Sequence, residues 1–170
     1  PHHTLETLNS LCNNQEIMWK NTAIVITTIN RSTKAINRLK EFAEINGSKL
    51  IIVGDKKTPD YKDSAHLEYL GIEKQESLYP NFAKLVPYNH YCRKNIGYLY
   101  ALNNGFQYIF DTDDDNIPYD AFQDIFKFNF QKIIKYASNE LDSVNIYKYF
   151  SKNTIWPRGL PLQNIHNFNE

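Results

Sequence analysis

The residues best suited to chemistry form an acidic cluster, with Asp111, Asp113, Asp114 and Asp115 close together in the sequence. They follow residues 106–110, an apolar run that predicts a strand. Four carboxylates at the end of a buried strand repel one another and lose hydration, so they need compensating positive charge. A divalent cation bound by hard oxygen ligands would supply it, whereas a solvated acidic turn or a helix cap is the simpler alternative.

The register of an extended segment decides which of these carboxylates share a side. Alternation places Asp111, Asp113 and Asp115 on one side and Asp114 on the other. We therefore expect the three odd-numbered aspartates to converge on one metal ion. An EF-hand is excluded, because the sixth and twelfth positions of the loop are Asn116 rather than Gly and Phe122 rather than Glu.

Two basic residues, Arg93 and Lys94, stand at the expected start of a helix ahead of the acidic cluster. Cations beside a helix N-terminus, together with its free amide groups, suit a phosphate. Gly97 lies one turn further along on the same face as Arg93, where backbone or ligand can approach closely. A solvated basic turn, with Gly97 serving the packing of one helix against another, would explain these residues equally well, and both interpretations stay open here.

Further polar residues are expected at the same edge of the sheet. Thr27 and Thr28 end the first predicted strand, and Asp55 ends the second. A carboxylate there can accept hydrogen bonds from a nucleobase or a ribose, or it can bond its own backbone in a turn. Trp156 and Arg158 offer an aromatic face and another cation, or they form a turn anchored by the intervening proline.

The elements that must position these residues begin with a βαβ unit. Residues 23–29 and 49–53 are nearly continuous apolar runs, as expected of strands covered on both faces. Between them runs an amphipathic helix that Ser32 or Thr33 can cap and Gly47 ends. A strand, a helix and a strand joined by short connections indicate parallel, right-handed pairing.

The rest of the chain continues the α/β pattern. We expect short helices over residues 65–70 and 73–78, helices over 91–104 and 121–136, and strands over 106–110 and 143–149. The sequence therefore predicts an α/β layered domain.

Composition excludes several classes of protein. The 170 residues carry 19 basic and 19 acidic side chains, so the neutral balance supplies no general attraction to nucleic acid or anionic lipid. No apolar run is long enough to span a bilayer. Cys12 and Cys92 alone exclude a disulfide scaffold and favour a reducing compartment, so a cytoplasmic location is expected.

Several motifs follow one another at the spacing of a known family. They are the Thr27-Thr28 pair, Val53-Gly54-Asp55-Lys56-Lys57-Thr58-Pro59, Pro87-Tyr88-Asn89, Arg93-Lys94-Asn95-Ile96-Gly97, Asp111-Thr112-Asp113-Asp114-Asp115-Asn116 and Trp156-Pro157-Arg158-Gly159. Over residues 23–165 the sequence resembles the STELLO-like (DUF288) glycosyltransferase-related family. More distantly, it is similar to the reversibly glycosylated polypeptides, which are UDP-arabinopyranose mutases.

This resemblance implies a GT-A fold, a Rossmann-like nucleotide-sugar-binding α/β fold with a mainly parallel central sheet, flanking helices and an Asp-x-Asp motif. In such folds the motif carries Mn²⁺ or Mg²⁺, which bridges the diphosphate of a nucleotide sugar, with a UDP-sugar expected first. Carried onto this chain, Asp113 and Asp115 form the motif pair, and Asp111 fits the alternative register.

The resemblance also assigns the remaining positions. Asp55 would meet the base, Thr27 to Ile29 the nucleoside, and Arg93 the diphosphate. The expected nucleotide-sugar-binding set is completed by Gly97, Asp113, Asp114, Trp156 and Arg158.

The chain departs from the family pattern after the acidic cluster. GT-A enzymes usually continue with acceptor-binding segments, a catalytic base and often a late metal ligand, but few residues follow Asp115 here. Glu140, Asp142 and His166 are the nearest candidates for a base, and the catalytic residue stays unassigned. We expect residues 1–22 to be an N-terminal extension and residues 23–170 a GT-A-like domain without a full acceptor-binding region.

The expected activity is metal-dependent transfer of a sugar from a nucleoside diphosphate sugar to an acceptor. A nucleotide-sugar mutase and a non-catalytic nucleotide-binding or partner-assembly module are the alternatives. A haloacid-dehalogenase-type phosphotransferase is disfavoured, because its motif continues to Thr or Val where this chain has Asp115 after Asp114. Plant members of the family are Golgi membrane proteins, so the Golgi lumen is the alternative location if the chain is part of a longer anchored protein.

Overall fold

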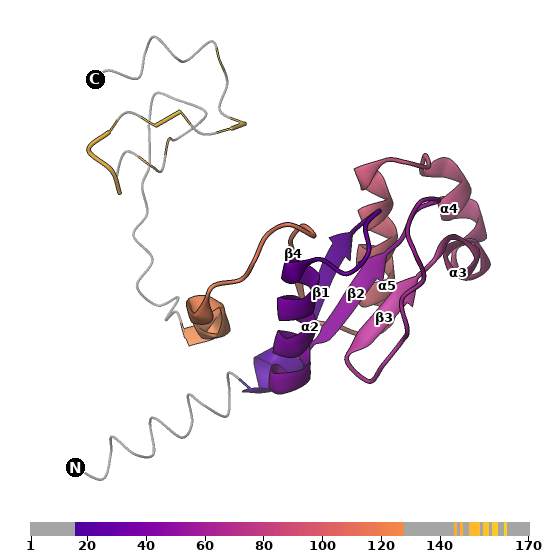
Figure 1. The fold of residues 1–170 in the computed structure, drawn as a ribbon, viewed down its shortest axis with the longest axis horizontal. Helices are drawn as coiled ribbons and strands as arrows, with labels where there is room; N and C mark the ends of the chain where they lie inside the picture. Colours follow the sequence, from indigo (N-terminus) through magenta and orange to yellow (C-terminus); the bar gives the residue numbers. More distant parts are fainter. Residues whose placement is uncertain are drawn as a thin grey trace. The chain divides into compact units, whose positions relative to one another are not determined.

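A computed structural model of the chain describes residues 16–127 and, beyond them, residues 145, 147, 150–153, 155, 156, 158, 159 and 162. The chain divides into two compact units, residues 1–129 and residues 130–170. All the helices and strands labelled in Figure 1 belong to the first unit. In chain order, the elements of this unit are β1 (Thr22–Thr27), α2 (Lys34–Asn46), β2 (Lys49–Val53), β3 (Leu67–Leu70), α3 (Ile72–Leu78), α4 (Pro80–Leu85), the 3-10 helix η1 (Tyr91–Arg93), α5 (Lys94–Asn103), β4 (Tyr108–Asp111) and the 3-10 helix η2 (Asp120–Lys127), the two 3-10 helices carrying no label in the figure.

The central sheet has four strands in the order β3-β2-β1-β4, and every neighbouring pair is parallel. The chain builds outward from β1 to β2 and β3, and then returns to place β4 on the other side of β1. This reversal creates a topological switch point beside β1, the place where open α/β sheets bind ligands at the carboxyl ends of their strands. The prediction of an α/β fold with a mainly parallel central sheet and flanking helices is confirmed.

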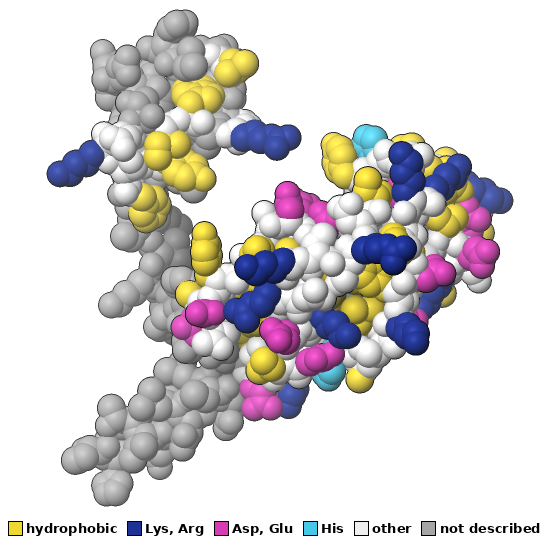
Figure 2. Space-filling view, viewed as in Figure 1, with side chains coloured by type: hydrophobic (Ala, Val, Ile, Leu, Met, Phe, Trp, Pro, Cys, Tyr) yellow, Lys and Arg dark blue, Asp and Glu magenta, His cyan; other side chains and the backbone are white. Residues whose placement is uncertain are grey.

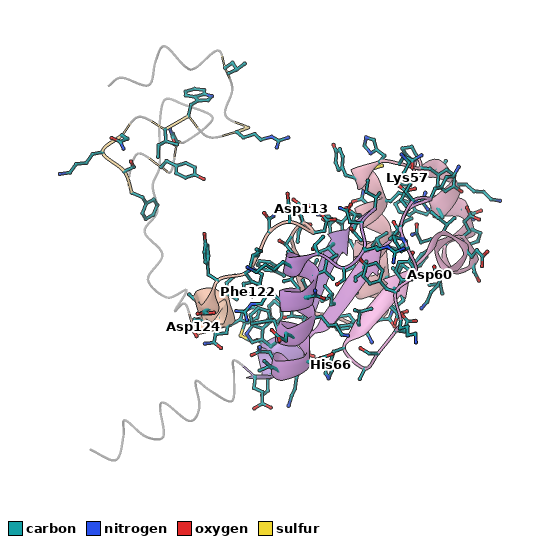
Figure 3. The ribbon with its side chains drawn as sticks, in the orientation of Figure 1. Lys57, Asp60, His66, Asp113, Phe122 and Asp124 are labelled. Carbon is teal, nitrogen blue, oxygen red and sulfur yellow. The ribbon has the colours of Figure 1, made fainter. Side chains whose placement is uncertain are left out.

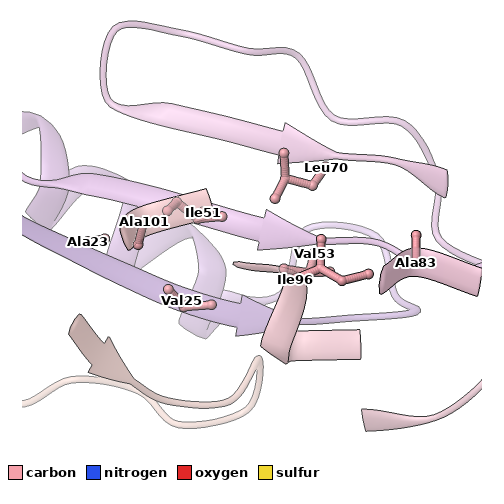
Figure 4. Close-up of a cluster of buried hydrophobic side chains, with 8 residues drawn as sticks. All are labelled: Ala23, Val25, Ile51, Val53, Leu70, Ala83, Ile96 and Ala101. Carbon is pink, nitrogen blue, oxygen red and sulfur yellow. The ribbon is translucent and has the colours of Figure 1, made fainter. Parts of the chain in front are cut away.

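The two faces of the sheet pack against different helices. Ile24 and Ile26 of β1 share one hydrophobic cluster with buried side chains of α2. Val25 of β1 and Val53 of β2 share another with α5, as Figure 4 shows. Because successive side chains of a strand point to opposite faces, covering both faces requires an unbroken apolar run. This requirement explains the two runs recognised in the sequence.

The predicted limits of helix α2 are confirmed in chemical detail. Thr33 caps its N-terminus, where the hydroxyl oxygen accepts a hydrogen bond from the backbone amide of Ile36 at 3.1 Å. Gly47 ends the helix with a φ of 77°, a left-handed conformation that glycine adopts without a side-chain clash.

Gly97 lets helix α5 lie directly on the sheet. A Cβ atom at this position would stand 2.6 Å from Val25 Cγ1 and 2.6 Å from Val53 Cγ2. Of the two interpretations of Gly97, the structure therefore supports close packing, here of a helix against the sheet.

The structure corrects the prediction of a helix over residues 65–70, where it has strand β3. Leu67 and Leu70 are buried, and the strand pairs in parallel with β2 along its length. Four residues are too few to show a period of two, and Glu68, which forms ion pairs with Lys49 and Lys74, hides the pattern further.

The predicted elements near the C-terminus lie largely outside the described residues. Of the helix expected over 121–136, the described part belongs to the 3-10 helix η2. Of the strand expected over 143–149, only Asn145 and Tyr147 are described, and Tyr147 lies in a 3-10 turn instead.

Charges of both signs are mixed on the described part of the first unit that Figure 2 shows. This mixing agrees with the neutral composition. Among the described helices, none combines the length and the apolar character that crossing a bilayer requires.

Candidate functional site

A cavity of about 360 Å³ opens at the carboxyl ends of β1 and β2. Figure 3 shows Asp113 and Lys57 at this end of the sheet and His66 at the opposite end. The lining residues come from the ends of both strands, the segment before α5 and the loop after β4: Thr27, Thr28, Ile29, Asn30, Val53, Gly54, Asp55, Lys57, Asn89, His90, Tyr91, Arg93 and Asp114. The cavity therefore stands where a parallel sheet of this topology binds ligands.

Asp114 is the member of the acidic cluster that lines this cavity. Its Oδ2 accepts hydrogen bonds from the Thr28 hydroxyl and from Asn30 Nδ2, the latter at 3.0 Å. Its backbone oxygen accepts a bond of 2.5 Å from the Thr33 hydroxyl, which also caps α2. Burial, and after it the negative charge of Asp114, raises the pKa of Tyr61. Asp114 is therefore held at the end of β1 and the start of α2.

The side chains of Asp111 and Asp113 form ion pairs with Lys94 instead. The Lys94 ammonium lies 2.8 Å from Asp111 Oδ1, 2.7 Å from Asp113 Oδ1 and 2.8 Å from the backbone oxygen of Thr112. Burial acts to lower the pKa of Lys94, but the hydrogen bonds to the two carboxylates outweigh it and the pKa is raised. Burial, followed by a hydrogen bond to Asp111, raises the pKa of Tyr98 to about 12.

The predicted alternation thus separates Asp111 and Asp113 from Asp114, but a lysine supplies the compensating charge for the first two. Within the described residues, no three Asp, Glu, His or Cys side chains converge as a metal cluster requires. Asp115 is exposed, and its side chain has no partner among the residues that the structure describes. A metal site made by Asp111, Asp113 and Asp115 is not preformed in this part of the chain, and metal dependence stays a prediction.

Asp55 fastens the segment before α5 to the end of β2. Its Oδ1 accepts a hydrogen bond of 2.7 Å from the Lys56 amide, and its Oδ2 accepts one of 3.3 Å from the His90 amide. The side chain lines the cavity although the residue is 9% exposed. The neighbouring Asn89 has a φ of 53°, which is uncommon for a residue with a side chain and is found most often for Asn.

Arg93 also reaches the cavity, from the wall formed by the segment before α5. The residue is 1% exposed, so its guanidinium is enclosed by protein rather than by water. Its hydrogen bonds run to Gln75 and to the backbone oxygen of Val86. The predicted contact with a diphosphate stays a prediction, although the cation stands at the cavity wall.

The structure therefore brings together most of the residues expected to bind a nucleotide sugar: Thr27, Thr28, Ile29, Asp55, Arg93 and Asp114. It does not bring Gly97 to the cavity, because this glycine faces the sheet, and Asp113 faces Lys94. Trp156 and Arg158 belong to the second unit, and their part in nucleotide-sugar binding stays a prediction.

Sequence reasoning assigned no binding role to the rest of the cavity lining, namely Asn30, Val53, Gly54, Lys57, Asn89, His90 and Tyr91. Val53 ends β2, and each of the others lies in a segment that follows a strand or precedes α5, close in sequence to a residue that was recognised. The topology itself was the available signal, because segments that leave the carboxyl ends of neighbouring parallel strands meet at one crevice.

Comparison with known proteins adds independent evidence. The probable glycosyltransferase STELLO2 of Arabidopsis thaliana is 28% identical over 158 residues, which is 86% of this chain, and the probable glycosyltransferase STELLO1 of the same plant is 29% identical over 143 residues, or 77%. The chain is thus similar in sequence to two STELLO proteins. No family model matches it.

The predicted resemblance to the STELLO-like family is thereby confirmed, and the parallel α/β architecture is consistent with a GT-A-like glycosyltransferase fold. The chain spans about a fifth of the length of these two STELLO proteins, 20% and 18% respectively.

Proposed function

We propose that this chain binds a nucleoside diphosphate sugar together with a divalent cation, as the donor-binding part of a glycosyltransferase-like enzyme. One observation carries the proposal: the cavity at the carboxyl ends of β1 and β2 is lined both by a carboxylate, Asp114, and by an enclosed cation, Arg93. A metal-bound diphosphate needs partners of both signs. The similarity to two proteins named as probable glycosyltransferases supports the same class of ligand.

The cavity walls suggest how such a donor would be oriented. Thr27, Thr28 and Asp55 offer polar groups at the ends of β1 and β2, where the nucleoside would bind. Arg93 would face the diphosphate and stabilise the negative charge that develops on it when the bond to the sugar breaks. A UDP-sugar is the first donor to test, as the family resemblance implies.

The donor set around Asp114 fits a hard cation such as Mg²⁺ or Mn²⁺. Carboxylate and carbonyl oxygens are the ligands these ions take, and Mg²⁺ usually binds through one or two carboxylates plus substrate phosphates rather than in an all-protein cage. A single cavity carboxylate is therefore sufficient on the protein side. When bound, the cation would neutralise charge on the leaving diphosphate. Asp114 would hold it, rather than Asp113 or Asp115.

A non-catalytic nucleotide-binding module is the second candidate, and the carboxylates of the cavity favour it. Asp55 and Asp114 are the acidic residues that line the cavity in the described part of the chain, and both accept hydrogen bonds from neighbouring groups. Neither is a free base for activating an acceptor. The base would then come from outside the described residues or be absent.

Calorimetry would test the proposal directly. UDP, UDP-sugars and other nucleoside diphosphates are titrated into the chain with Mn²⁺, with Mg²⁺ and with a chelator. We expect saturable binding that is stronger with the cation, and no nucleotide binding under any of these conditions would refute the proposal. Product analysis with a bound UDP-sugar separates transfer or hydrolysis, a mutase product, and the unchanged donor expected of a binding module.

A further inference from the structure

The buried guanidinium of Arg93 has only neutral hydrogen-bond partners. Arg93 Nη1 donates to the backbone oxygen of Val86 at 3.0 Å, and Nε donates to Gln75 Oε1 at 2.9 Å, with Nη2 bonding the same oxygen. Among the described residues, no Asp or Glu side chain forms an ion pair with it. A buried charge is costly unless it is paired, so the fold maintains an uncompensated cation in a residue that lines the cavity.

The carboxylate of Asp55, a residue that lines the same cavity, is engaged elsewhere. Its two oxygens accept hydrogen bonds from the backbone amides of Lys56 and His90. Tyr88 lies next to Arg93, with the guanidinium carbon 4.6 Å from the ring centroid, and the Lys56 ammonium lies 4.0 Å from the same centroid. An aromatic ring attracts a cation without neutralising it, so the positive charge of Arg93 stays available to a ligand.

Gln75 is the residue that fixes this arrangement. The residue is completely buried, and its two amide atoms are both used. Nε2 donates to the backbone oxygens of Gly54 at 2.7 Å and Leu70 at 2.5 Å, while Oε1 receives the bonds from Arg93. Gly54 lines the cavity at the end of β2, so one side chain on α3 sets the position of both a strand end and a guanidinium.

The chemistry of position 75 admits few other side chains. A glutamate has the same length and would form an ion pair with Arg93, but it would neutralise the cation and turn a second oxygen toward the carbonyl groups of Gly54 and Leu70. A methionine fills similar space and forms none of the four bonds. Only an uncharged amide both donates to the two carbonyl groups and accepts from the guanidinium without cancelling its charge.

We infer that Gln75 is a positioning residue of the donor site, which holds Arg93 at the cavity wall and leaves its charge free for the diphosphate of the ligand. The inference rests on the proposed function for the identity of the ligand. It predicts that the selectivity of the cavity for anionic over neutral ligands depends on a side chain that does not itself line the cavity.

The test compares ligands that differ in charge. UDP, inorganic pyrophosphate and uridine are titrated into the wild-type chain and the variants Gln75→Glu and Gln75→Met, with a chelator so that Arg93 acts without metal. Uridine binding is followed by ligand-detected NMR. Gln123→Glu adds the same negative charge at a residue outside this cavity and serves as the matched control.

We expect Gln75→Glu to weaken binding of UDP and pyrophosphate roughly tenfold to hundredfold, the range for losing a hydrogen bond to a charged group, while uridine affinity changes less than about twofold. Gln75→Met, which removes the hydrogen bonds that hold the guanidinium, should also lower the ratio of UDP affinity to uridine affinity. Gln123→Glu should leave the ratio unchanged. Thermal melting establishes whether each variant is folded at the assay temperature. If Gln75→Glu is unfolded, the result for Gln75→Met decides the test.

Other outcomes overturn the inference. Equal losses for uridine and UDP would mean that Gln75 only supports the fold, and an unchanged ratio in both variants would mean that it does not position Arg93. If the wild type binds pyrophosphate but no nucleoside diphosphate, the proposed function fails, and pyrophosphate binding by the variants still tests the role of Gln75. If the wild type binds neither ligand, both the proposed function and the inference about Gln75 fail.

Discussion

Replacing Asp114 by Asn, with Asp115→Asn as the matched control, separates the carboxylate that the cavity geometry favours from one that the sequence favours. Both substitutions remove one negative charge from the same loop and keep the size of the side chain. Asp114 lines the cavity, whereas Asp115 is exposed. A difference between the two variants therefore reports the position of the charge rather than the charge of the loop.

The structure gives the expected cost to stability. Thr28 and Asn30 both donate to the same oxygen of Asp114, so the oxygen of an asparagine side chain can accept both bonds. The loss is the difference between charge-assisted and neutral hydrogen bonds, about 1 kcal/mol for each bond. We expect Asp114→Asn to be destabilised by about 1–2 kcal/mol and to remain folded, and Asp115→Asn to be unchanged within about 0.5 kcal/mol.

The effect on binding should be larger and should depend on metal. Loss of residues that only support metal ligands typically costs 10–100-fold in metal affinity, so loss of a direct ligand should cost at least about a hundredfold. We expect Asp114→Asn to lose this factor in UDP affinity with Mn²⁺ and to bind UDP like the wild type in chelator. Calorimetry on both variants measures this. Undiminished Mn²⁺-dependent binding by Asp114→Asn, with a loss in Asp115→Asn, would refute the assignment and restore the sequence prediction.

Three further predictions concern the framework of the site. Gly97→Ala should lower the free energy of unfolding by about 1–3 kcal/mol and the melting temperature by several degrees, because its Cβ would lie 2.6 Å from two valine methyl groups. Gly105→Ala is the control: its Cβ meets no atom within 4 Å, so it should lower the free energy of unfolding by only about 1 kcal/mol, for its left-handed backbone. Thr33→Ala should cost about 1 kcal/mol, measured by urea unfolding, since it removes the cap of α2 as well as the bond to the loop of Asp114. The pKa of Lys94 is raised above its ordinary value of 10.5, so its stabilising contribution is complete below about pH 10.5 and is lost as the pH rises through the folded pKa. Lys94→Met should therefore be less stable at pH 8 and should lose less stability between pH 8 and 11.5, and parallel pH profiles for the two proteins would contradict this.

The sequence is most informative where local chemistry and tertiary environment agree. Residues 23–29 and 49–53 are nearly continuous apolar runs because both faces of the sheet are covered, and Thr33 and Gly47 mark the ends of α2 with the residue types that helix ends require. These features follow from steric and hydrogen-bonding rules that act within a few residues. They suffice to predict a parallel α/β fold and the edge of the sheet at which the cavity opens.

Strand β3 shows where such reasoning fails. Its four residues carry no periodic signal, and they become a strand because the backbone of β2 offers an unpaired edge at the right place. Gln75 is a second example, since a glutamine on a short helix has no sequence signal of function. Its importance comes from Gly54, Leu70 and Arg93, which the fold brings around one amide.

The acidic cluster combines both situations. Alternation along the chain separates Asp111 and Asp113 from Asp114, as their ion pairs with Lys94 do, but residues 114 and 115 form a turn, and alternation cannot say which side meets the cavity. Lys94 decides this, because it stands at the start of α5, and α5 lies close to the sheet through Gly97. The ammonium is thereby placed where it captures the first two carboxylates and leaves Asp114 to the cavity. Gly97, which has no side chain, thus allows the close packing of α5 that leaves Asp114, rather than Asp111 or Asp113, lining the cavity.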